Sequence, residues 1–567
     1  MNKISELEDR IKREIGNLIM NIEKPYPNQI YLHVKRSNLL EVCSYVFYKL
    51  GGFLSTMVGT DERNLCSMFT LRYVFSIEDV DIYDSDDEKP WVIVSTEIPP
   101  DDPTFPSVTP KIPSAVWYER EVRDLLGLEP VGHPDPRRLV LPDDWPEGVY
   151  PLRKEYKHDI RPPSIPEKYE FKPETKGEKI IQVPIGPVHA AVDEPAQFRV
   201  FLDGEKVVDL DYRMFYIYRG IEKISESRLT YNQVPFIAER ICGICGNAHS
   251  CCYCQAVEQA MRINVPERAK YIRTIMLEIE RLHSHLLWLG IACHLAAFDW
   301  GFMEFFKVRE IIMYLAEILS GGRKTYGINI IGGVRRDITE KRAEKALKML
   351  NEFEEEYKKV LDTVVSTSTF IKRVKDVGVL PKEVARKTSV VGPVARGSGI
   401  KRDTRKDHPY ASYDEIDFKV PTYDDGDVLS RALVRAEEAL ESINIIRQAI
   451  ENMPSGPIIT DEKEYINYAK GLGAVEAPRG EDVHFVILGP LSKVYRHRIR
   501  ASTYNNWPVV PYMCRGYTLA DVPLIIASID PCYSCTERVL LIDVKTGSRK
   551  NISYDYLLNL CRKGGRL

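Results

Sequence analysis

The chain has 567 residues, of which 44% are hydrophobic and 28% charged, enough for a buried core and about two to four domains. Its 78 Lys and Arg against 82 Asp and Glu give a net charge of −4, which argues against a nucleic-acid-binding surface. No run reaches the roughly 18–20 apolar residues of a membrane-spanning helix, and the charged N-terminus lacks the apolar stretch of a signal peptide. We therefore expect a cytoplasmic chain, whose 12 cysteines are buried thiols or metal ligands rather than disulfides.

The first part of the chain, residues 1–157, has the pattern of an α+β domain. The N-terminal 16 residues form a charged amphipathic sequence that predicts a helix. Short alternating runs rich in β-branched and aromatic residues predict strands at 31–36, 69–75 and 91–98. After a cluster of prolines, residues 114–128 predict a helix, because Trp117, Glu121 and Leu125 recur at four-residue spacing.

Residues 158–177 combine prolines with many charges, which predicts a stiff, extended connector and a domain boundary. The region that follows, 178–538, opens with strand-like runs and then becomes mainly helical. A helix is expected to begin at Pro266 and Glu267, since proline and an acid both suit the first helical turn. The remaining predicted elements are strands at 179–186, 198–204 and 206–212 and helices at 303–320, 340–375 and 427–452.

Two widely separated Cys-x-x-Cys pairs carry the clearest chemical signal: Cys242 with Cys245, and Cys532 with Cys535. Two intervening residues let both sulfurs of a pair converge on one metal, and thiolates select zinc, copper, nickel or iron. A bound cation also lowers the thiol pKa from its usual value of about 8.5. Spacing alone leaves both a structural zinc and a redox metal open, although zinc ribbons place their pairs much closer together in sequence.

The residues around these pairs resemble the large subunits of NiFe hydrogenases. The matching segments are RICGICGNAH, which ends at His249, and DPCYSCTER near the C-terminus. Between them lie ERLHSHLLWLGIACH (280–294), GGVRRD (332–337), GPVARGSG (392–399) and EAPRGEDVHF (476–485). Residues 115–146, followed by YPLRKEY, resemble instead the small peripheral subunit of respiratory complex I. This fusion resembles the membrane-associated, energy-converting (group 4) hydrogenases of the formate hydrogenlyase type.

The resemblance implies a nickel–iron centre that catalyses H2 ⇌ 2H⁺ + 2e⁻. Cys242 and Cys532 would be terminal nickel ligands, and Cys245 and Cys535 would bridge nickel to an iron carrying CO and cyanide. His249 would hydrogen-bond this ligand set. Cys251, Cys252 and Cys254 are not required by the family, so we expect buried thiols there.

The same resemblance assigns roles around the metals. Glu194 matches a proton-relay glutamate, although an exposed acid in a turn is the alternative. Arg479 matches an arginine that overhangs the metals, with Asp299 and Asp530 as the acids that hold it. A structural network of buried charges is the alternative for these three residues. The adjoining Pro478, and Thr503 in ASTYNNWP, are assigned to the cofactor pocket, where Thr503 would hydrogen-bond a cyanide or be an ordinary buried threonine.

The C-terminal part carries two further expectations. Glu222 resembles a glutamate that binds magnesium or iron near the mature C-terminus of related enzymes. Those enzymes typically end in histidine, whereas Arg538 stands here, which is a departure from the pattern. Residues 539–567 resemble an extension that a maturation protease removes after nickel insertion, by cutting between Arg538 and Val539.

The implied partners are an iron–sulfur small subunit with 4Fe–4S clusters, integral membrane subunits related to complex I, and formate dehydrogenase. Through them the chain would attach to the inner face of the cytoplasmic membrane. The alternatives are a fused quinone-site subunit of complex I, which lacks the nickel cysteines, and a zinc-stabilised assembly subunit.

Overall fold

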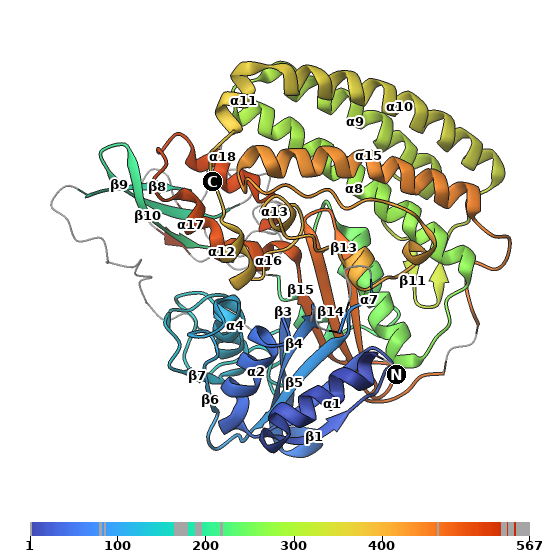
Figure 1. Ribbon diagram of the computed structural model, residues 1–567. Helices are drawn as coiled ribbons and strands as arrows, with labels where there is room; N and C mark the ends of the chain where they lie inside the picture. Colours follow the sequence, from blue (N-terminus) through green and yellow to red (C-terminus); the bar gives the residue numbers. More distant parts are fainter. Residues whose placement is uncertain are drawn as a thin grey trace.

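The computed structural model describes residues 3–78, 82–83, 87–160, 162–163, 180–186, 195–215, 219–461, 464–533, 541–542 and 549–550. Figure 1 shows a sheet with covering helices in the first region, a second sheet beside it, and a layer of long helices. None of the helices in these ranges is long and apolar enough to cross a membrane. The α+β first region and the mainly helical second region are confirmed, whereas the domain boundary stays a prediction.

The first region is built on one five-stranded sheet with the order β1-β2-β5-β4-β3. The three predicted strands are confirmed as β2, β4 and β5, and the predicted helices as α1 and α4. β3 was not predicted, because it is buried along its whole length and so lacks alternation. The bounds are α1 (Lys3–Ile15), β1 (Ile19–Glu23), β2 (Gln29–Val34), α2 (Leu39–Tyr48), β3 (Gly52–Glu62), β4 (Met68–Ile77), β5 (Trp91–Ile98) and α4 (Val116–Leu126).

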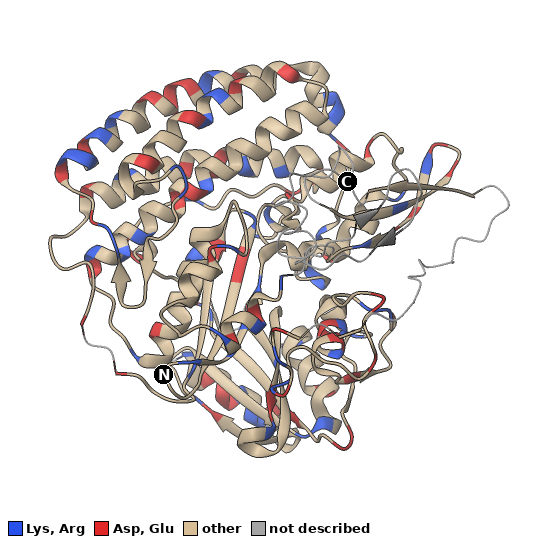
Figure 2. Ribbon diagram, turned by 180° about the vertical axis from the view of Figure 1, so that it is seen from behind, with Lys and Arg blue, Asp and Glu red and all other residues tan. Residues whose placement is uncertain are grey.

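The second region begins with the three predicted strands, which form one small antiparallel sheet. A layer of long helices follows, in which α8 contacts both α9 and α15, and α9 contacts α10 (Figure 1). α8 is buried around most of its surface, whereas α10 carries charges of both signs on its outer side (Figure 2). The bounds are β8 (Ile180–Ile185), β9 (Gln197–Asp203), β10 (Lys206–Arg213), α8 (Glu267–Leu295), α9 (Asp299–Ser320), α10 (Glu340–Ser366) and α15 (Val428–Asn452).

One predicted helix is wrong in its length. The run 340–375 is interrupted at Thr367, whose ψ of 103° is extended, and α11 (Ser368–Val374) begins after it. The Ser and Thr residues at this point compete for backbone hydrogen bonds: the Thr367 hydroxyl donates to the Thr363 carbonyl at 2.7 Å.

A further sheet, which the sequence patterns did not predict, carries much of the site. It consists of β13 (Lys470–Ala477), β14 (Gly480–Leu488) and β15 (Val494–Arg500). Helix α7 (Gly246–Met261) crosses it closely, since a Cβ at Gly473 would lie 2.1 Å from the Cys252 carbonyl oxygen. Apolar residues of β13 and β14 share one core with residues of β2 to β5, so the two regions pack directly together.

Candidate metal centre

The first cysteine pair lies at the N-terminal end of α7. Cys242 is in the turn before this helix, and Cys245 is its N-cap residue. The Cys242 sulfur accepts hydrogen bonds from the backbone N–H groups of Ile244 and Cys245, at 3.4 and 3.5 Å. Backbone N–H groups and the positive end of a helix favour an anionic sulfur, so this turn is suited to thiolates.

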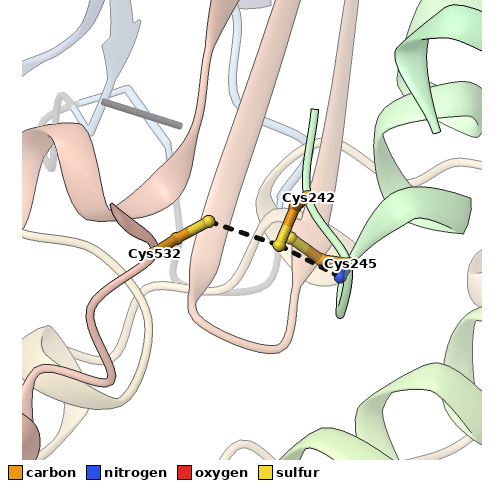
Figure 3. Close-up of side chains that lie close together, drawn as sticks. All are labelled: Cys242, Cys245 and Cys532. Atoms are coloured by element: carbon orange, nitrogen blue, oxygen red, sulfur yellow. Dashed lines mark hydrogen bonds between the residues drawn. The ribbon is translucent and has the colours of Figure 1, made fainter. Parts of the chain in front are cut away.

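Cys532 reaches the same place from the other end of the region. It follows α18 (Val522–Ser528), which packs against α8 and α15, and a turn at Asp530 with a φ of 53°. The sulfurs of Cys532 and Cys242 are 3.2 Å apart. The sulfurs of Cys242, Cys245 and Cys532 all lie within 4.8 Å of one another and are buried (Figure 3). The predicted convergence is therefore confirmed for three of the four cysteines.

This crowding makes the thiols dependent on a cation. Hydrogen bonding with Cys242 and Cys532, together with burial, raises the pKa of the Cys245 thiol well above its usual range. A soft metal ion supplies the positive charge that lets neighbouring sulfurs ionise together. The donor set therefore fits the expected nickel–iron centre, although three sulfurs by themselves also fit zinc.

A buried arginine lies near these sulfurs. Arg479 donates from Nε to the Asp530 carbonyl oxygen and from Nη2 to its carboxylate, both at 2.7 Å. Burial opposes the charge of Arg479, but Asp530 and the three cysteines raise the pKa of the guanidinium. Its Nη1 is buried and has no hydrogen-bond partner among the residues described. Because an unsatisfied buried donor is costly, this atom is suited to a ligand bound beside the sulfurs.

Two glycines position the turn that carries Arg479. A Cβ at Gly392, where φ is +66°, would lie 2.2 Å from the Arg479 carbonyl oxygen. A Cβ at Gly480, where φ is +124°, would lie 2.6 Å from the Gly392 nitrogen. Residues other than glycine rarely adopt these angles. The GPVARG and APRG motifs are therefore two sides of one close backbone contact.

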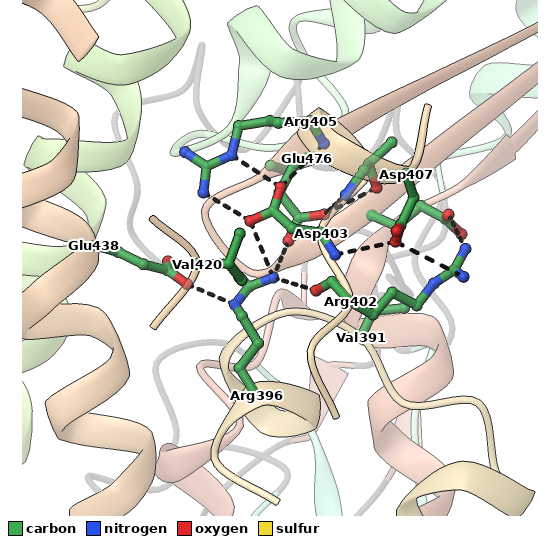
Figure 4. Close-up of polar contacts among 12 residues, drawn as sticks. Val391, Arg396, Arg402, Asp403, Arg405, Asp407, Val420, Glu438 and Glu476 are labelled. Carbon is green, nitrogen blue, oxygen red and sulfur yellow. Dashed lines mark hydrogen bonds and ion pairs between the residues drawn. The ribbon is translucent and has the colours of Figure 1, made fainter. Parts of the chain in front are cut away.

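Behind this contact is a network of buried charges that sequence reasoning missed (Figure 4). It joins α13 (Pro393–Arg396), α15 and β13. Arg396 pairs with Glu438 at 2.6 Å and with Glu476 at 2.9 Å, and Glu476 also accepts the Thr404 N–H at 3.0 Å. Buried ions are tolerated when they are paired, so this network holds the loop and the sheet in one arrangement.

Thr503 and His249 lie close to the thiols, and Pro478 adjoins Arg479. The Thr503 hydroxyl oxygen accepts the Cys532 N–H at 3.3 Å, which leaves the hydroxyl hydrogen available as a donor. A ring nitrogen of His249 and a carboxylate oxygen of Asp482 lie within 4.8 Å of the Cys245 sulfur and of each other. Pro478 is buried in the turn between β13 and β14.

Asp299 does not belong to this site, so its predicted role is wrong. It begins α9 with 77% of its side chain exposed, and its carboxylate lies 2.8 Å from Nδ1 of His294. In the part of the chain that the structure describes, Asp530 is the one acid paired with Arg479. A sequence match fixed the position of Asp299 along the chain but not the direction in which its side chain points.

Glu222 also departs from its predicted role as a metal ligand. It is buried in α5 (Ile221–Ser227), and its carboxylate oxygens lie 2.7 Å from Arg496 and 3.3 Å from Arg498. The Ile499 N–H donates to the same carboxylate at 2.9 Å. A magnesium ion would have to displace two guanidinium groups, so these residues do not fit a cation site. Glu222 is an ion-pair residue.

The remaining predicted site residues lie outside the described ranges: Glu194, Cys535, Arg538 and Val539. Their assignments as proton relay, fourth sulfur ligand and cleavage site stay predictions.

The three additional cysteines of α7 agree with expectation. Cys251, Cys252 and Cys254 are fully buried, and burial raises the pKa of each thiol. They are not among the described thiols that gather around Cys242.

Other buried groups near α7 were missed. Glu280 accepts the N–H groups of Asn247 and Ala248, both at 2.8 Å, and burial raises the pKa of this carboxyl to about 8. His484 and His497, which extend from His249 across the sheet, were also missed. Glu280 begins the ERLHSHLLWLGIACH motif and His484 lies inside the EAPRGEDVHF motif, which were the available signals; no pattern indicated His497.

Three family descriptions match the chain. "Nickel-dependent hydrogenase" matches residues 219–304, which include the first cysteine pair. "Respiratory-chain NADH dehydrogenase, 49 Kd subunit" matches 298–471 and 466–538, and the "30 Kd subunit" matches 32–161. Together they agree with a complex I-like first region fused to a hydrogenase-like second region.

Among curated relatives, formate hydrogenlyase subunit 5 of Escherichia coli (strain K12) is 48% identical over 94% of this chain and 92% of its own length. Hydrogenase-4 component G of the same organism is 45% identical over 96% of this chain and 94% of its own length. This chain belongs to the formate hydrogenlyase and hydrogenase-4 family of NiFe hydrogenase large subunits. It is thus the large subunit of an oxidoreductase that acts on hydrogen.

The relatives also bear on the alternative of a quinone-site subunit. The C/D subunit of NADH-quinone oxidoreductase from Phocaeicola vulgatus is 36% identical over 84% of this hydrogenase subunit and 93% of its own length. A solved chain of the membrane-bound sulfane sulfur reductase, an archaeal respiratory membrane complex, is 30% identical with a TM-score of 0.60, covering 64% of this chain and 99% of that one. The shared fold therefore extends beyond hydrogenases, and identity together with the retained thiols favours the hydrogenase.

Proposed function

We propose that this chain makes H2 from protons and electrons at a nickel–iron centre bound by Cys242, Cys245, Cys532 and Cys535. The observation that carries the proposal is the convergence of three buried sulfurs from two distant parts of the sequence. When bound, the metal pair, with CO and cyanide on its iron, supplies the redox chemistry of H2. The sulfurs of Cys242, Cys245, Cys532 and Cys535 would hold this metal pair, and Cys242 and Cys532 would be its terminal ligands.

The protein side chains shape the space beside the sulfurs. Arg479, held by Asp530, directs the unpaired Nη1 donor toward a bound ligand. The Thr503 hydroxyl, fixed by the Cys532 N–H, supplies a second donor. Pro478 has no N–H group and is buried next to Arg479, so it is proposed to add an apolar surface that excludes water. Positioned donors in a dry pocket act more strongly than they would in water.

Protons must also reach the centre, because an isolated charge in a buried site is very costly. Glu194 is proposed as the carboxylate that accepts and releases them. Its sequence position, ahead of the first cysteine pair, supports this assignment.

Electrons are proposed to arrive through a partner subunit with 4Fe–4S clusters. Among the described residues, only one group of thiols lies close enough together to hold a metal, and it consists of Cys242, Cys245 and Cys532. Membership of a membrane-bound complex is supported by the relatives, which include membrane-bound hydrogenase subunit alpha of Pyrococcus furiosus, 40% identical over 68% of this chain and 93% of its own length. Integral membrane subunits and a formate dehydrogenase are the proposed neighbours, and a maturation protease is proposed to cut between Arg538 and Val539.

The test is metal analysis of the purified complex combined with infrared spectroscopy. We expect bound nickel together with the infrared bands of metal-bound CO and cyanide. The mass of the mature chain should correspond to a C-terminus at Arg538. Zinc without nickel and without those bands would contradict the proposal in favour of a structural site. Active enzyme that retains residues 539–567 would contradict only the proposed cleavage between Arg538 and Val539.

A further inference from the structure

Three buried histidines form a continuous line that leads away from the thiols. Nδ1 of His249 lies 3.1 Å from Nε2 of His484, and Nδ1 of His484 lies 3.0 Å from Nε2 of His497. All three side chains are fully buried. His497 pairs in register with Val486, two residues beyond His484, so the two rings are diagonal neighbours on one face of the sheet.

The inner end of the line is at the thiol pocket. Asp482 accepts the Ser502 N–H with Oδ1 at 2.7 Å, and its Oδ2 lies 3.5 Å from Nε2 of His249. The Cys245 sulfur lies within 4.8 Å of these two groups. The first imidazole therefore connects the pocket to the second without an intervening side chain.

The outer end lies near the boundary between the two regions. Nδ1 of His497 is buried and has no hydrogen-bond partner in the part of the chain described. The backbone N–H of His497 reaches Glu226 at 3.4 Å, and Glu226 pairs at 2.7 Å with Lys154, whose side chain is 19% exposed. A carboxylate and a partly exposed ammonium group thus lie beside the backbone of the last histidine, at the edge of the first region.

The chemistry of neutral imidazole suits such a line. A neutral ring donates a hydrogen bond from one nitrogen and accepts one at the other. Burial lowers the pKa of His484 well below its ordinary value and lowers that of His497 to about 3, so both rings are neutral near pH 7. Two N···N contacts in series can then be satisfied in two ways, with every hydrogen on Nε2 or every hydrogen on Nδ1. A proton taken up at one end and released at the other converts one arrangement into the other.

We propose that His249, His484 and His497 conduct protons between the thiol pocket and the Glu226–Lys154 edge, by a route separate from Glu194. The proposal rests on the hydrogenase function, which supplies the protons to be moved. His484 and His497 act at a distance from the metals, through His249. A first region fused to the catalytic one would then form one wall of the proton exit.

Isotope exchange between D2 and water tests the route in the intact complex. We expect His484→Phe and His497→Phe each to slow the exchange at least about tenfold, since positioned proton transfer contributes roughly 10²–10⁴-fold. Tyr253→Phe is the matched control: its ring packs 4.9 Å from that of His497, but its hydroxyl bonds the Tyr231 carbonyl and lies outside the line. This control should exchange within about twofold of the wild type.

Two readouts separate failure of this route from failure of the proposed function. Nickel content and the infrared bands of CO and cyanide should be unchanged in all variants. Unchanged exchange in both histidine variants with intact bands would overturn the route and leave the hydrogenase function standing, whereas a wild type without nickel and bands would remove the function itself. Imidazole added to His497→Ala should restore part of the exchange, which a merely structural role would not produce.

Nitrogen-15 spectra of histidine-labelled complex provide a measurement that does not depend on turnover or on variants that fold. The two neutral tautomers and the imidazolium ion have distinct ring-nitrogen shifts. We expect His484 and His497 to be neutral at pH 7 and to share one tautomer. An imidazolium, or opposite tautomers in adjacent rings, would break the line of hydrogen bonds and overturn the proposal.

Discussion

The thiol pocket and the surroundings of Glu222 are both buried collections of acidic groups, yet they differ in how directly cations pair with them. Among the described residues, the three sulfurs have Arg479 nearby, which is itself paired with Asp530, and Lys324, whose charge interacts with Cys242. In contrast, Glu222 pairs with both Arg496 and Arg498. Burial opposes the charge of Glu222, but the two arginines lower the pKa of its carboxyl.

The surrounding pairs strengthen this contrast. Arg498 also pairs with Glu121 of the first region, and Arg496 also pairs at 3.0 Å with Glu226. With Lys154, which pairs with Glu226, the Glu222 site has three cations for its three carboxylates, and it joins the two regions. A motif residue thus indicates the type of ligand, whereas the partners already present decide whether a metal ion is needed.

The largest expected effect is at the thiol pocket. We expect Cys532→Ala to abolish nickel binding and H2 production, because it removes a ligand on which the other thiols depend. The measurements are nickel per chain and evolved H2. Cys514→Ala is the matched control, since Cys514 is also a buried cysteine but lies apart from the thiol group, and it should retain nickel. Substantial H2 output from metal-replete Cys532→Ala would contradict the assignment of this pocket as the catalytic metal site.

A smaller loss is expected at the arginine that faces the sulfurs. Arg479→Lys keeps the charge but loses the planar group that bonds Asp530 twice. We expect the turnover rate to fall about 100-fold, the scale for losing one positioned donor, with nickel and the infrared bands retained. Loss of nickel in this variant would instead assign Arg479 to holding the pocket together.

The same contrast explains how far sequence patterns reached. Three of the four motif cysteines, Asp530 and Thr503 lie together in the structure, because each belongs to a short motif whose residues stay close in space. The prediction for Asp299 was wrong because its motif spans the turn between α8 and α9. A match along the chain does not fix the direction of a side chain in such a turn. His497 and Glu280 come from separate elements, and no local spacing records their approach to α7.

The fold shows a similar division. Strands β2, β4 and β5 were found because they contain runs of β-branched and aromatic residues. β3 and β13 were missed, because both are buried along nearly their whole length and contain small or polar residues. Their place depends on contacts with α7 and with the neighbouring sheet, which arise only when distant segments meet.

The smallest effect on activity is expected at Glu222. Glu222→Gln leaves Arg496 and Arg498 with one carboxylate fewer, but Glu226 and Glu121 still pair with them. We therefore expect the free energy of unfolding to fall by about 3 kcal/mol, the low end for breaking a buried ion pair, with nickel content and turnover per folded chain unchanged. Denaturant unfolding measures the first quantity, and metal analysis and H2 output measure the others. Removing magnesium from the wild type should change none of them, because guanidinium groups occupy the position that a metal ion would take. If magnesium depletion reproduced the stability loss of Glu222→Gln, the two sites would be alike after all, and the arginines would have to move aside for a cation.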